Sequence, residues 1–305
     1  MRLGWRLSLP FGWCRLLLLR ASARARALSS LLLFVLCPKR TLAFRTSREL
    51  YGGRLRAHPR VAGHTLAGLV GGKLAKAGEA LAESAASEGE GDGEGEGKGG
   101  EGDPLRRALV LVDTAGCGME EAEEAGCSGS GSSSGGGSKL NEGEARAAIA
   151  YVARLIRAGV PASAIGVITP YSAQLGLLRS LRSGAPGDGG GTASSSSSSG
   201  GHGGLLPCAR GLEDELALVE MSTVDGFQGR EKEAIVISAV RSNPRGEVGF
   251  LADQRRMNVA VSRARRQCAI VGDSETLGRE PFLARLIAHV LARGDVISAQ
   301  ELEGI

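Results

Sequence analysis

The segment STVDGFQGREKEAIVISAVRSN (Ser222–Asn243) decides the fold, because it joins a glycine-containing turn to a long apolar run. The run, Ala234–Val240, has the length and composition of a strand and predicts a buried one. The turn before it carries Gly226 and Gly229, which allow the backbone to approach a ligand closely. Gln, Arg, Glu and Lys residues follow the turn, and these are costly to bury unless they are paired or bound. As a pattern alone, this still favours a solvated charged loop over a ligand site.

Strands and helices alternate on both sides of this segment. Apolar runs predict strands, whereas apolar residues spaced by three or four predict helices. The expected strands are Ala108–Val112, Ile165–Ile168, Val219–Thr223, Ala234–Val240 and Cys268–Val271, and the expected helices lie near Ala145–Ile156, Tyr171–Arg182, Asp253–Arg266 and Pro281–Leu291. This alternation predicts an α/β fold, a doubly wound parallel sheet with helices on both faces.

In doubly wound sheets the functional residues lie in loops at the carboxyl ends of the strands. Three junctions carry unusual polar content and are expected there: Asp113–Gly118, Thr223–Glu233 and Arg255–Arg266. The first, within LVLVDTAG (Leu109–Gly116), is similar to the magnesium-proximal turn of GTPases. That function needs a GxxxxGK[ST] phosphate cradle, which this sequence lacks, so we interpret the junction as a structural strand end.

The third junction, RRMNVAVSRARR (Arg255–Arg266), contains five arginines and no acidic residue. On a helix, Arg256 and Arg263 would share one face. The apolar face would consist of Met257, Val261 and Ala264. Arginine is the preferred partner of phosphate because its planar fork donates two parallel hydrogen bonds. The cluster lies beside an apolar helix face, which favours an anion site over a solvated basic surface.

Composition limits the size of the folded part. The chain has 305 residues, of which 47 are glycine and 42% are apolar. More than half of the glycines fall in low-complexity stretches near 77–104, 126–143 and 184–211, which we expect to be flexible loop insertions. The remaining length suits one domain with a real core. The six cysteines form no CxxC pair and no spacing suited to zinc, so no metal site is expected.

The N-terminal region differs in charge from the rest. Residues 1–48 are rich in Arg and Lys and contain no acidic residue. Arg20, Arg24 and Arg26 interrupt its apolar runs, so neither a transmembrane helix nor a membrane partner is expected. Such a start suits an organellar transit peptide, and the alternatives are an artefact of the gene model or a disordered extension. We expect a nuclear or cytoplasmic location, and targeting to an organelle by this N-terminal region is the alternative.

Two long motifs carry a family resemblance. TVDGFQGREKEAIVISAVRSN (Thr223–Asn243) and RRMNVAVSRARR (Arg255–Arg266) resemble motifs V and VI of superfamily 1B helicases, in the branch of the nonsense-decay helicase and the immunoglobulin mu-binding-protein helicase. Four further segments also match: GVITPYSAQ (Gly166–Gln174), GEVGFLADQ (Gly246–Gln254), LVDTAGCG (Leu111–Gly118) and SRELYGGRL (Ser47–Leu55). The likeness covers about Ser47 to Ala292.

The resemblance implies a RecA-like lobe and a nucleotide site. In this family two such lobes clamp ATP with Mg²⁺ between them and move along single-stranded DNA or RNA, in the 5′ to 3′ direction. The resemblance places Arg263 as the arginine finger at the γ-phosphate, with Arg256 as a supporting charge. The other nucleotide-binding residues that it implies are Gln228, Gly229, Arg230, Glu231 and Arg266. The nucleic-acid track would be bordered by Thr169, Pro170, Tyr171 and Thr223.

The first lobe's motifs do not occur in this sequence. The phosphate loop, the Asp-Glu pair and the Gly-Asp-x-x-Gln sensor are missing, and LCPKRTLAFRT (Leu36–Thr46) stands where an arginine-bearing segment is expected. We therefore expect residues 1–46 to replace the true upstream sequence, residues 47–293 to form the second lobe, and residues 294–305 to form a tail.

A lone second lobe would lack catalytic activity. For activity it would need a first lobe, either as a separate partner or as a part missing from this sequence, and that lobe would make most of the contacts to ATP and Mg²⁺. The alternatives are a non-enzymatic nucleic-acid- or partner-binding module and a truncation product with no role of its own.

Overall fold

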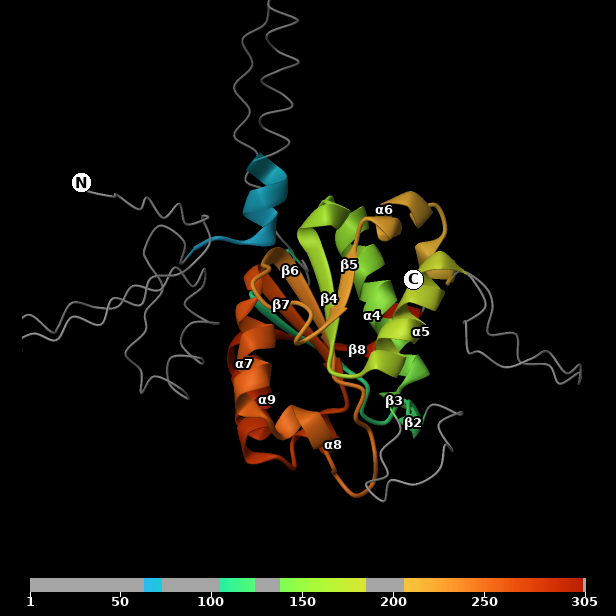
Figure 1. Ribbon diagram of the computed structural model, residues 1–305. Coiled ribbons are helices and arrows are strands. Elements are labelled where there is room, and N and C mark those ends of the chain that lie inside the picture. Colours follow the sequence, from blue (N-terminus) through green and yellow to red (C-terminus); the bar gives the residue numbers. More distant parts are fainter. Residues whose placement is uncertain (1–62, 73–104, 124–137, 185–205, 304–305) are drawn as a thin grey trace, which may run out of the picture. The chain divides into compact units, whose positions relative to one another are not determined.

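The computed structural model describes residues 63–72, 105–123, 138–184 and 206–303 (Figure 1). Within these ranges six strands form one sheet in the order β5-β4-β6-β7-β1-β8, and every neighbouring pair is parallel. These strands are β1 (Leu109–Asp113), β4 (Ile165–Thr169), β5 (Glu220–Thr223), β6 (Lys232–Ser238), β7 (Ala264–Gly272) and β8 (Asp295–Ser298). A separate antiparallel pair consists of β2 (Ala122–Glu123) and β3 (Lys139–Leu140).

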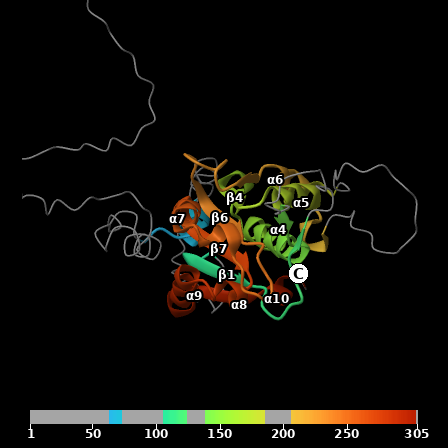
Figure 2. The same cartoon turned by 60° about the horizontal axis from the view of Figure 1, so that its bottom comes forward.

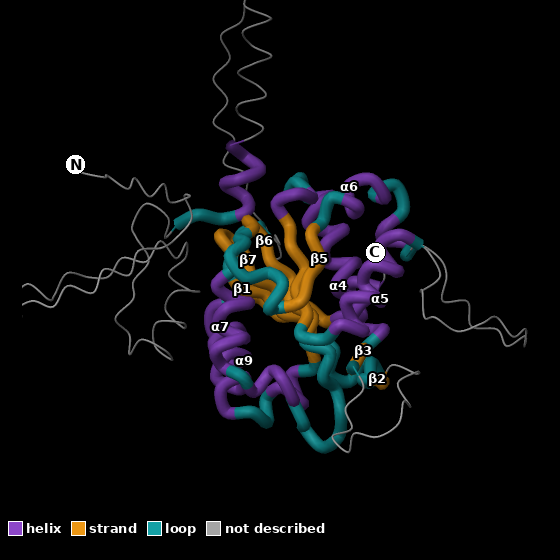
Figure 3. The backbone as a smooth tube through the Cα atoms, viewed as in Figure 1, coloured by secondary structure: helices purple, strands orange, loops and turns teal. Residues whose placement is uncertain are grey.

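Helices cover both faces of the sheet (Figures 1 and 2). One face carries α4 (Glu142–Arg157), α5 (Ser172–Ser183), α6 (Glu213–Ala217) and α10 (Ala299–Glu303), and the other carries α7 (Gln254–Ser262), α8 (Ser274–Leu277) and α9 (Pro281–Arg293). Short 3-10 turns are η2 (Ala162–Ala164), η3 (Pro207–Ala209) and η4 (Gly249–Ala252). Figure 3 shows the strands as a layer between the two sets of helices. The predicted doubly wound, RecA-like α/β fold is confirmed.

Alternate residues of the central strands enter two hydrophobic cores. In β1, Val110 and Val112 join the core beneath α4, whereas Leu109 and Leu111 join the core beneath α9. All four side chains are fully buried. A strand that is apolar on both sides is what a parallel sheet with two helical layers requires.

The helix predicted over Asp253–Arg266 is shorter in the structure. The Asp253 carboxylate caps α7 by accepting from the amides of Arg255 and Arg256. The helix ends at Ser262 because Ala264 begins β7, whose first residue pairs with Lys232 of β6. The expectation of one continuous basic helix is therefore wrong for its last residues, which extend the sheet.

Described elements also lie within the expected insertions and the expected tail. Part of the second insertion forms β3 and the start of α4, and part of the third forms η3. The sheet continues beyond residue 293, because β8 pairs with β1 inside the expected tail. The insertion near 77–104, the extension 1–46 and the segment Ser47–Leu55 lie outside the described residues.

The connection from β5 to β6 decides how the predicted site residues are placed. Since all six strands are parallel, the sheet has one amino end, where strands begin, and one carboxyl end. Residues Val224–Glu231 must therefore cross β4 from the carboxyl end of β5 to the amino end of β6. They form successive turns and no helix, and Phe227 in their middle is fully buried against the sheet.

Gly166 of β4 makes room for this crossing. A Cβ atom on Gly166 would lie 2.8 Å from the ring of Phe227 and 3.0 Å from Ile235. The glycine thus lets an aromatic side chain pack directly on the strand that the connection crosses.

We predict that Gly166→Ala lowers the free energy of unfolding by about 1–3 kcal/mol, because an added methyl group overpacks this contact. Gly176→Ala is the matched control. Gly176 lies in α5 with nothing within 4 Å of an added Cβ, so the change should raise stability by up to about 1 kcal/mol. Urea unfolding measures both. Equal effects of the two substitutions would contradict the packing role of Gly166.

Candidate functional site

The predicted nucleotide-binding residues lie together at the amino end of the sheet. Gln228, Gly229, Arg230 and Glu231 are exposed in the last part of the crossing. Gly229 has a φ of +78°, a conformation that favours glycine. Arg263 follows α7 and meets this segment, since its Nη1 donates to the Arg230 carbonyl at 3.4 Å. The backbone completes the junction, because the Lys232 amide donates to the Arg263 carbonyl at 3.0 Å.

Charged side chains surround this junction. We call the following set the amino-end cluster: Arg230, Lys232, Arg263, Arg265 and Arg266 with Glu220, Glu231 and Glu233. Five cations thus face three carboxylates. Arg265 pairs with Glu231 at 3.2 Å and with Glu233 at 3.5 Å. The cluster keeps an excess of positive charge, which suits an anionic ligand.

Glu220 anchors one side of the amino-end cluster. It forms ion pairs with Arg230 and, at 3.1 Å, with Lys232. Burial acts to raise the pKa of Glu220, but the hydrogen bonds from Arg230 and Lys232 outweigh it and hold the pKa below its ordinary value. Glu220 therefore stays ionised and fixes the side chain of Arg230 against β5.

Arg263 differs from the other arginines in its partners. Its acceptors among the described residues are the Val259 carbonyl at 3.1 Å, the Arg230 carbonyl and the Ser262 hydroxyl at 3.3 Å. All three are uncharged oxygens, and the side chain is only half-buried. The guanidinium is thus held in place without a carboxylate partner among the described residues, as suits an arginine that meets a phosphate.

Arg266 has a different environment. Its Nε donates to Glu233 at 2.6 Å, and its Nη1 donates to the Thr65 carbonyl at 2.9 Å. These contacts tie β7 to β6 and to the short helix at 66–72. The Arg266 charge is therefore already paired, and its contact with a nucleotide stays a prediction.

The predicted nucleic-acid residues lie at the opposite, carboxyl end. Thr169 ends β4 and is fully buried, and Thr223 ends β5 directly beside it. Pro170 is half-buried. Tyr171 is 6% exposed, and its hydroxyl accepts from Arg241 Nη1 at 3.4 Å. Thr169 and Tyr171 are therefore buried beneath the carboxyl end and expose little surface to a ligand.

The expectation that the three polar junctions share the carboxyl end is wrong. Asp113–Gly118 lies there, but Arg263 and Gly229–Glu231 lie at the amino end. Helix α7 explains the difference, because it returns from the carboxyl end of β6 to the amino end of β7. Arg256 in its first turn and Arg263 after its last turn are therefore at opposite ends, so Arg256 does not support the finger.

Sequence reasoning missed a buried polar network at the carboxyl end. Glu144 of α4 is fully buried and accepts from the Val240 amide at 2.6 Å and from the Ser238 hydroxyl at 3.2 Å. Val240 has a φ of +74°, which is strained for a β-branched residue. Burial raises the pKa of Glu144 to about 8, although both hydrogen bonds lower it. No signal in the helical spacing of α4 distinguishes this carboxylate from a surface one.

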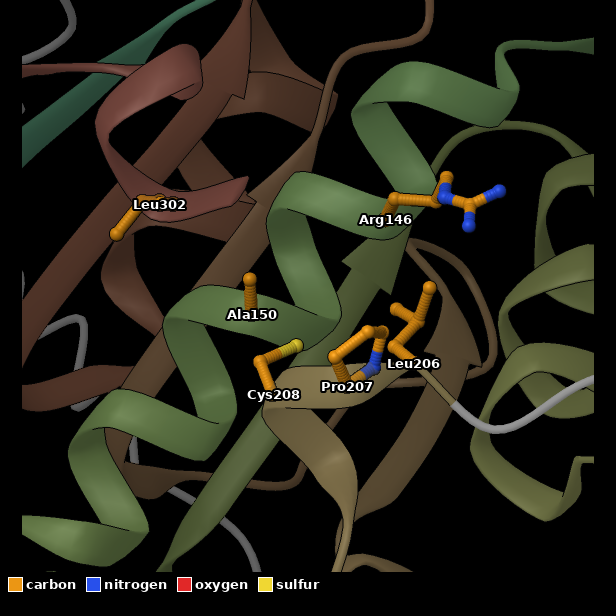
Figure 4. Close-up of a pocket in the computed structure, with 6 residues that line it drawn as sticks. All are labelled: Arg146, Ala150, Leu206, Pro207, Cys208 and Leu302. Atoms are coloured by element: carbon orange, nitrogen blue, oxygen red, sulfur yellow. The ribbon is translucent and has the colours of Figure 1, made fainter. Parts of the chain in front are cut away.

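A pocket of about 450 Å³ lies elsewhere, between α4, η3 and α10 (Figure 4). Its lining consists of Arg146, Ala150, Leu206, Pro207, Cys208 and Leu302. None of the predicted site residues contributes to it. Burial raises the pKa of the Cys208 thiol, which makes it a poor nucleophile at neutral pH. We therefore assign the pocket no part in the candidate site.

Residues 63–72, 105–123, 138–184 and 206–303 contain no group of three His, Cys, Asp or Glu side chains placed to hold a metal ion. No helix in the same part of the chain has the length and apolarity needed to cross a membrane.

The sheet order and its two helical layers define a RecA-like α/β domain. A family model described as an AAA domain matches residues 39–275. The chain is 37% identical over 255 residues to the DNA-binding protein SMUBP-2 of Rattus norvegicus, which is 84% of this chain and 19% of that protein. It is 39% identical over 180 residues to DNA polymerase alpha-associated DNA helicase A of Saccharomyces cerevisiae, covering 58% of the chain and 21% of that protein.

A third relative is the regulator of nonsense transcripts 1 homolog of Arabidopsis thaliana, 36% identical over 152 residues, or 50% of this chain and 10% of that protein. The chain belongs to this AAA-domain family of superfamily 1 helicases. It spans about a fifth of the length of the SMUBP-2 proteins that it matches.

The raised pKa of Glu144 predicts a pH dependence of stability. Between the ordinary pKa of 4.5 and about 8, the folded chain binds a proton at Glu144 that the unfolded chain has lost. The contribution of Glu144 to stability should therefore fall as pH rises through this range and level off above about 8. Glu144→Gln keeps the acceptor oxygen for Val240 but cannot ionise, so it should remove this fall.

Urea unfolding at pH 5 to 9 measures the difference. The variant should gain stability relative to the wild type as pH rises. A constant difference between the two proteins would contradict the buried, protonated state of Glu144.

Proposed function

We propose that this chain acts as the second RecA-like lobe of an ATP-dependent 5′–3′ DNA or RNA helicase and supplies its arginine finger, Arg263. One observation carries the proposal. The Arg263 guanidinium is held by three uncharged oxygens, lies beside the exposed Gly229 turn and has no ion pair within the described part of the chain. Family membership supports the helicase class, and the division of the chain into an extension, a lobe at 47–293 and a tail stays a prediction.

The amino-end cluster fits the triphosphate of ATP. Its excess positive charge and its exposed, positive-φ glycine are the features that phosphate oxygens and a close backbone approach require. Gln228, Gly229, Arg230 and Glu231 would form the lining on this side of the nucleotide. Mg²⁺ would supply positive charge at the phosphates, and we assign the residues that would hold it to the first lobe.

Arg263 would act in the phosphoryl-transfer step by stabilising charge. As the γ-phosphoryl group leaves, negative charge spreads over its equatorial oxygens, and a guanidinium placed there lowers the barrier. Such a finger raises the rate of phosphoryl transfer by about 10³- to 10⁵-fold. The hydrogen bonds from Arg263 to Val259 and Arg230 orient it before ATP arrives, so little reorganisation is needed.

The nucleic acid would bind at the opposite, carboxyl end. The relatives include one protein described as DNA-binding, one described as a DNA helicase and one described as a regulator of nonsense transcripts. For this chain we propose a single strand of DNA or RNA as the ligand. The carboxyl-end loops after β4, β5 and β6 would border it, with Thr169, Pro170, Tyr171 and Thr223 as their support. A nuclear or cytoplasmic location belongs to the same proposal.

A non-enzymatic binding module is the second candidate, and one observation favours it. The sequence contains no GxxxxGK[ST] phosphate cradle, so the proposed arginine finger would lack the loop that holds the phosphates on which it acts. In this case the chain binds nucleic acid through phosphate contacts and hydrolyses no ATP.

We predict no ATP turnover by the chain alone with single-stranded nucleic acid. Addition in trans of the first lobe from one of the helicase relatives should give turnover. Arg263→Ala should then lower that rate by about 10³-fold or more, and Arg263→Lys should restore little, because an ammonium cannot reproduce the planar fork. Phosphate release measures each rate.

Arg210→Ala is the matched control, because Arg210 is an exposed arginine directly after η3 and does not belong to the amino-end cluster. It should leave the stimulated rate unchanged. Turnover by the lone chain would refute the need for a first lobe. Full stimulation of Arg263→Ala would refute the finger, and salt-sensitive binding without stimulation would favour the binding module.

A further inference from the structure

An exposed aromatic ring stands at the carboxyl end of the sheet. Phe250 of η4 is 56% exposed. The other large hydrophobic side chains exposed among the described residues are aliphatic: Leu218, Leu291 and Val296. A single exposed apolar side chain needs no explanation by itself. What singles out Phe250 is that its surroundings hold the ring in place.

Tyr171 supports the ring from the protein side. The two rings meet edge to face, with centroids 5.7 Å apart and planes at 71°. Tyr171 is itself buried and bonded to Arg241, whose Nε donates to Glu121 at 2.7 Å. Phe250 therefore rests on a rigid base that reaches into the buried part of the carboxyl end.

Gly249 precedes Phe250 in the chain. It has a φ of +53°, and a Cβ there would lie 2.9 Å from the Tyr171 hydroxyl and closer still to the Arg241 guanidinium. The backbone at Gly249 thus lies directly on these two side chains, which leaves no room for a side chain at this position. Glycine meets both requirements at position 249, the positive φ and the close approach, and Phe250 follows it directly.

Arg256 adds a positive charge beside the ring. Its Cζ lies 5.6 Å from the Phe250 ring centroid. Its ion-pair distances are long, 3.8 Å to Asp225 and 3.6 Å to Asp253, and all three side chains are substantially exposed. Such exposed pairs contribute little, so the guanidinium can turn to a phosphate at small cost.

We propose that Phe250 is a stacking platform for one base of the single strand, with Arg256 as its phosphate partner. The inference rests on the proposed function and adds the contact that holds the strand. Every base has a π face, so stacking grips DNA or RNA without reading sequence, and an adjacent arginine supplies the backbone contact. This position agrees with the predicted nucleic-acid track. Tyr171, which contacts Phe250, follows β4, and Asp225, which pairs with Arg256, comes shortly after β5.

Fluorescence anisotropy with a short labelled single-stranded oligonucleotide tests the platform on the full chain. Phe250→Ala should weaken binding about 5- to 100-fold, and Phe250→Trp should retain it. Phe250→Leu keeps the apolar volume but loses the π face, so it should bind as weakly as the alanine variant. Leu218→Ala, an equally exposed apolar truncation after α6, should leave affinity unchanged.

Two further readouts separate stacking from charge. With an abasic oligonucleotide of the same length, the wild type and Phe250→Ala should bind equally. Phe250→Ala should leave the salt dependence of binding unchanged, whereas Arg256→Gln should reduce its logarithmic slope by about 1. Thermal unfolding should show that the alanine variant remains folded, since the ring is mostly exposed.

The results distinguish a failure of the stacking platform from a failure of the proposed function. If the wild type binds in a salt-dependent way and Phe250→Ala binds equally well, the stacking platform is overturned and the proposed function stands. Equal losses on the normal and the abasic strand also overturn stacking. If the wild type binds no single strand at all, both the platform and the nucleic-acid part of the proposed function are overturned.

Discussion

The short crossing from β5 to β6 is the constraint on which the placement of the site depends. β4 has five residues, about 16 Å of extended chain, and the crossing must pass its whole length. Val224–Glu231 can reach about 30 Å at full stretch, which leaves no length for the helix that usually joins parallel strands. Phe227 covers the sheet in place of that helix, and Gly166 lets it lie there.

This constraint separates the two proposed ligands. The crossing starts beside Thr223 at the carboxyl end and finishes at Gly229–Glu231 at the amino end. Helix α7 makes the same passage on its own side, from Arg256 at one end to Arg263 at the other. The two motifs that resemble the helicase family thus each touch both ends of the sheet. A change at the nucleotide would therefore be connected to the nucleic-acid end by two short elements, each packed on the sheet through part of its side chains, rather than by a long path.

Much of the fold could be predicted from the sequence because its strands are apolar on both sides and its helices are amphipathic. β1, β4 and β6 lie where apolar runs of strand length occur, and α4 and α9 follow the helical spacing. The early end of α7 could not be predicted, because Arg265 and Arg266 of β7 pair with Glu231, just before β6, and with Glu233 in β6. Local spacing contains no information about that long-range pairing.

The site was predictable to a lesser degree. The family resemblance groups Gln228–Glu231 with Arg263, and in the structure Arg263 donates to the Arg230 carbonyl within that group; their role at a nucleotide stays a prediction. Their position at the amino end was missed, because the general rule for doubly wound sheets favours the carboxyl end. Glu144 and Phe250 were also missed, since burial of a carboxylate and exposure of a ring depend on what packs around them in three dimensions.

Hydrogen–deuterium exchange on the chain assembled with a first lobe tests the separation of the two ligands most directly. A non-hydrolysable ATP analogue should slow exchange of amides in 228–231 and 263–266. A single-stranded oligonucleotide should instead slow exchange in the loops after β4 and β5 and in η4. Protection of the same end of the sheet by both ligands, or of the carboxyl end by the nucleotide, would contradict the account.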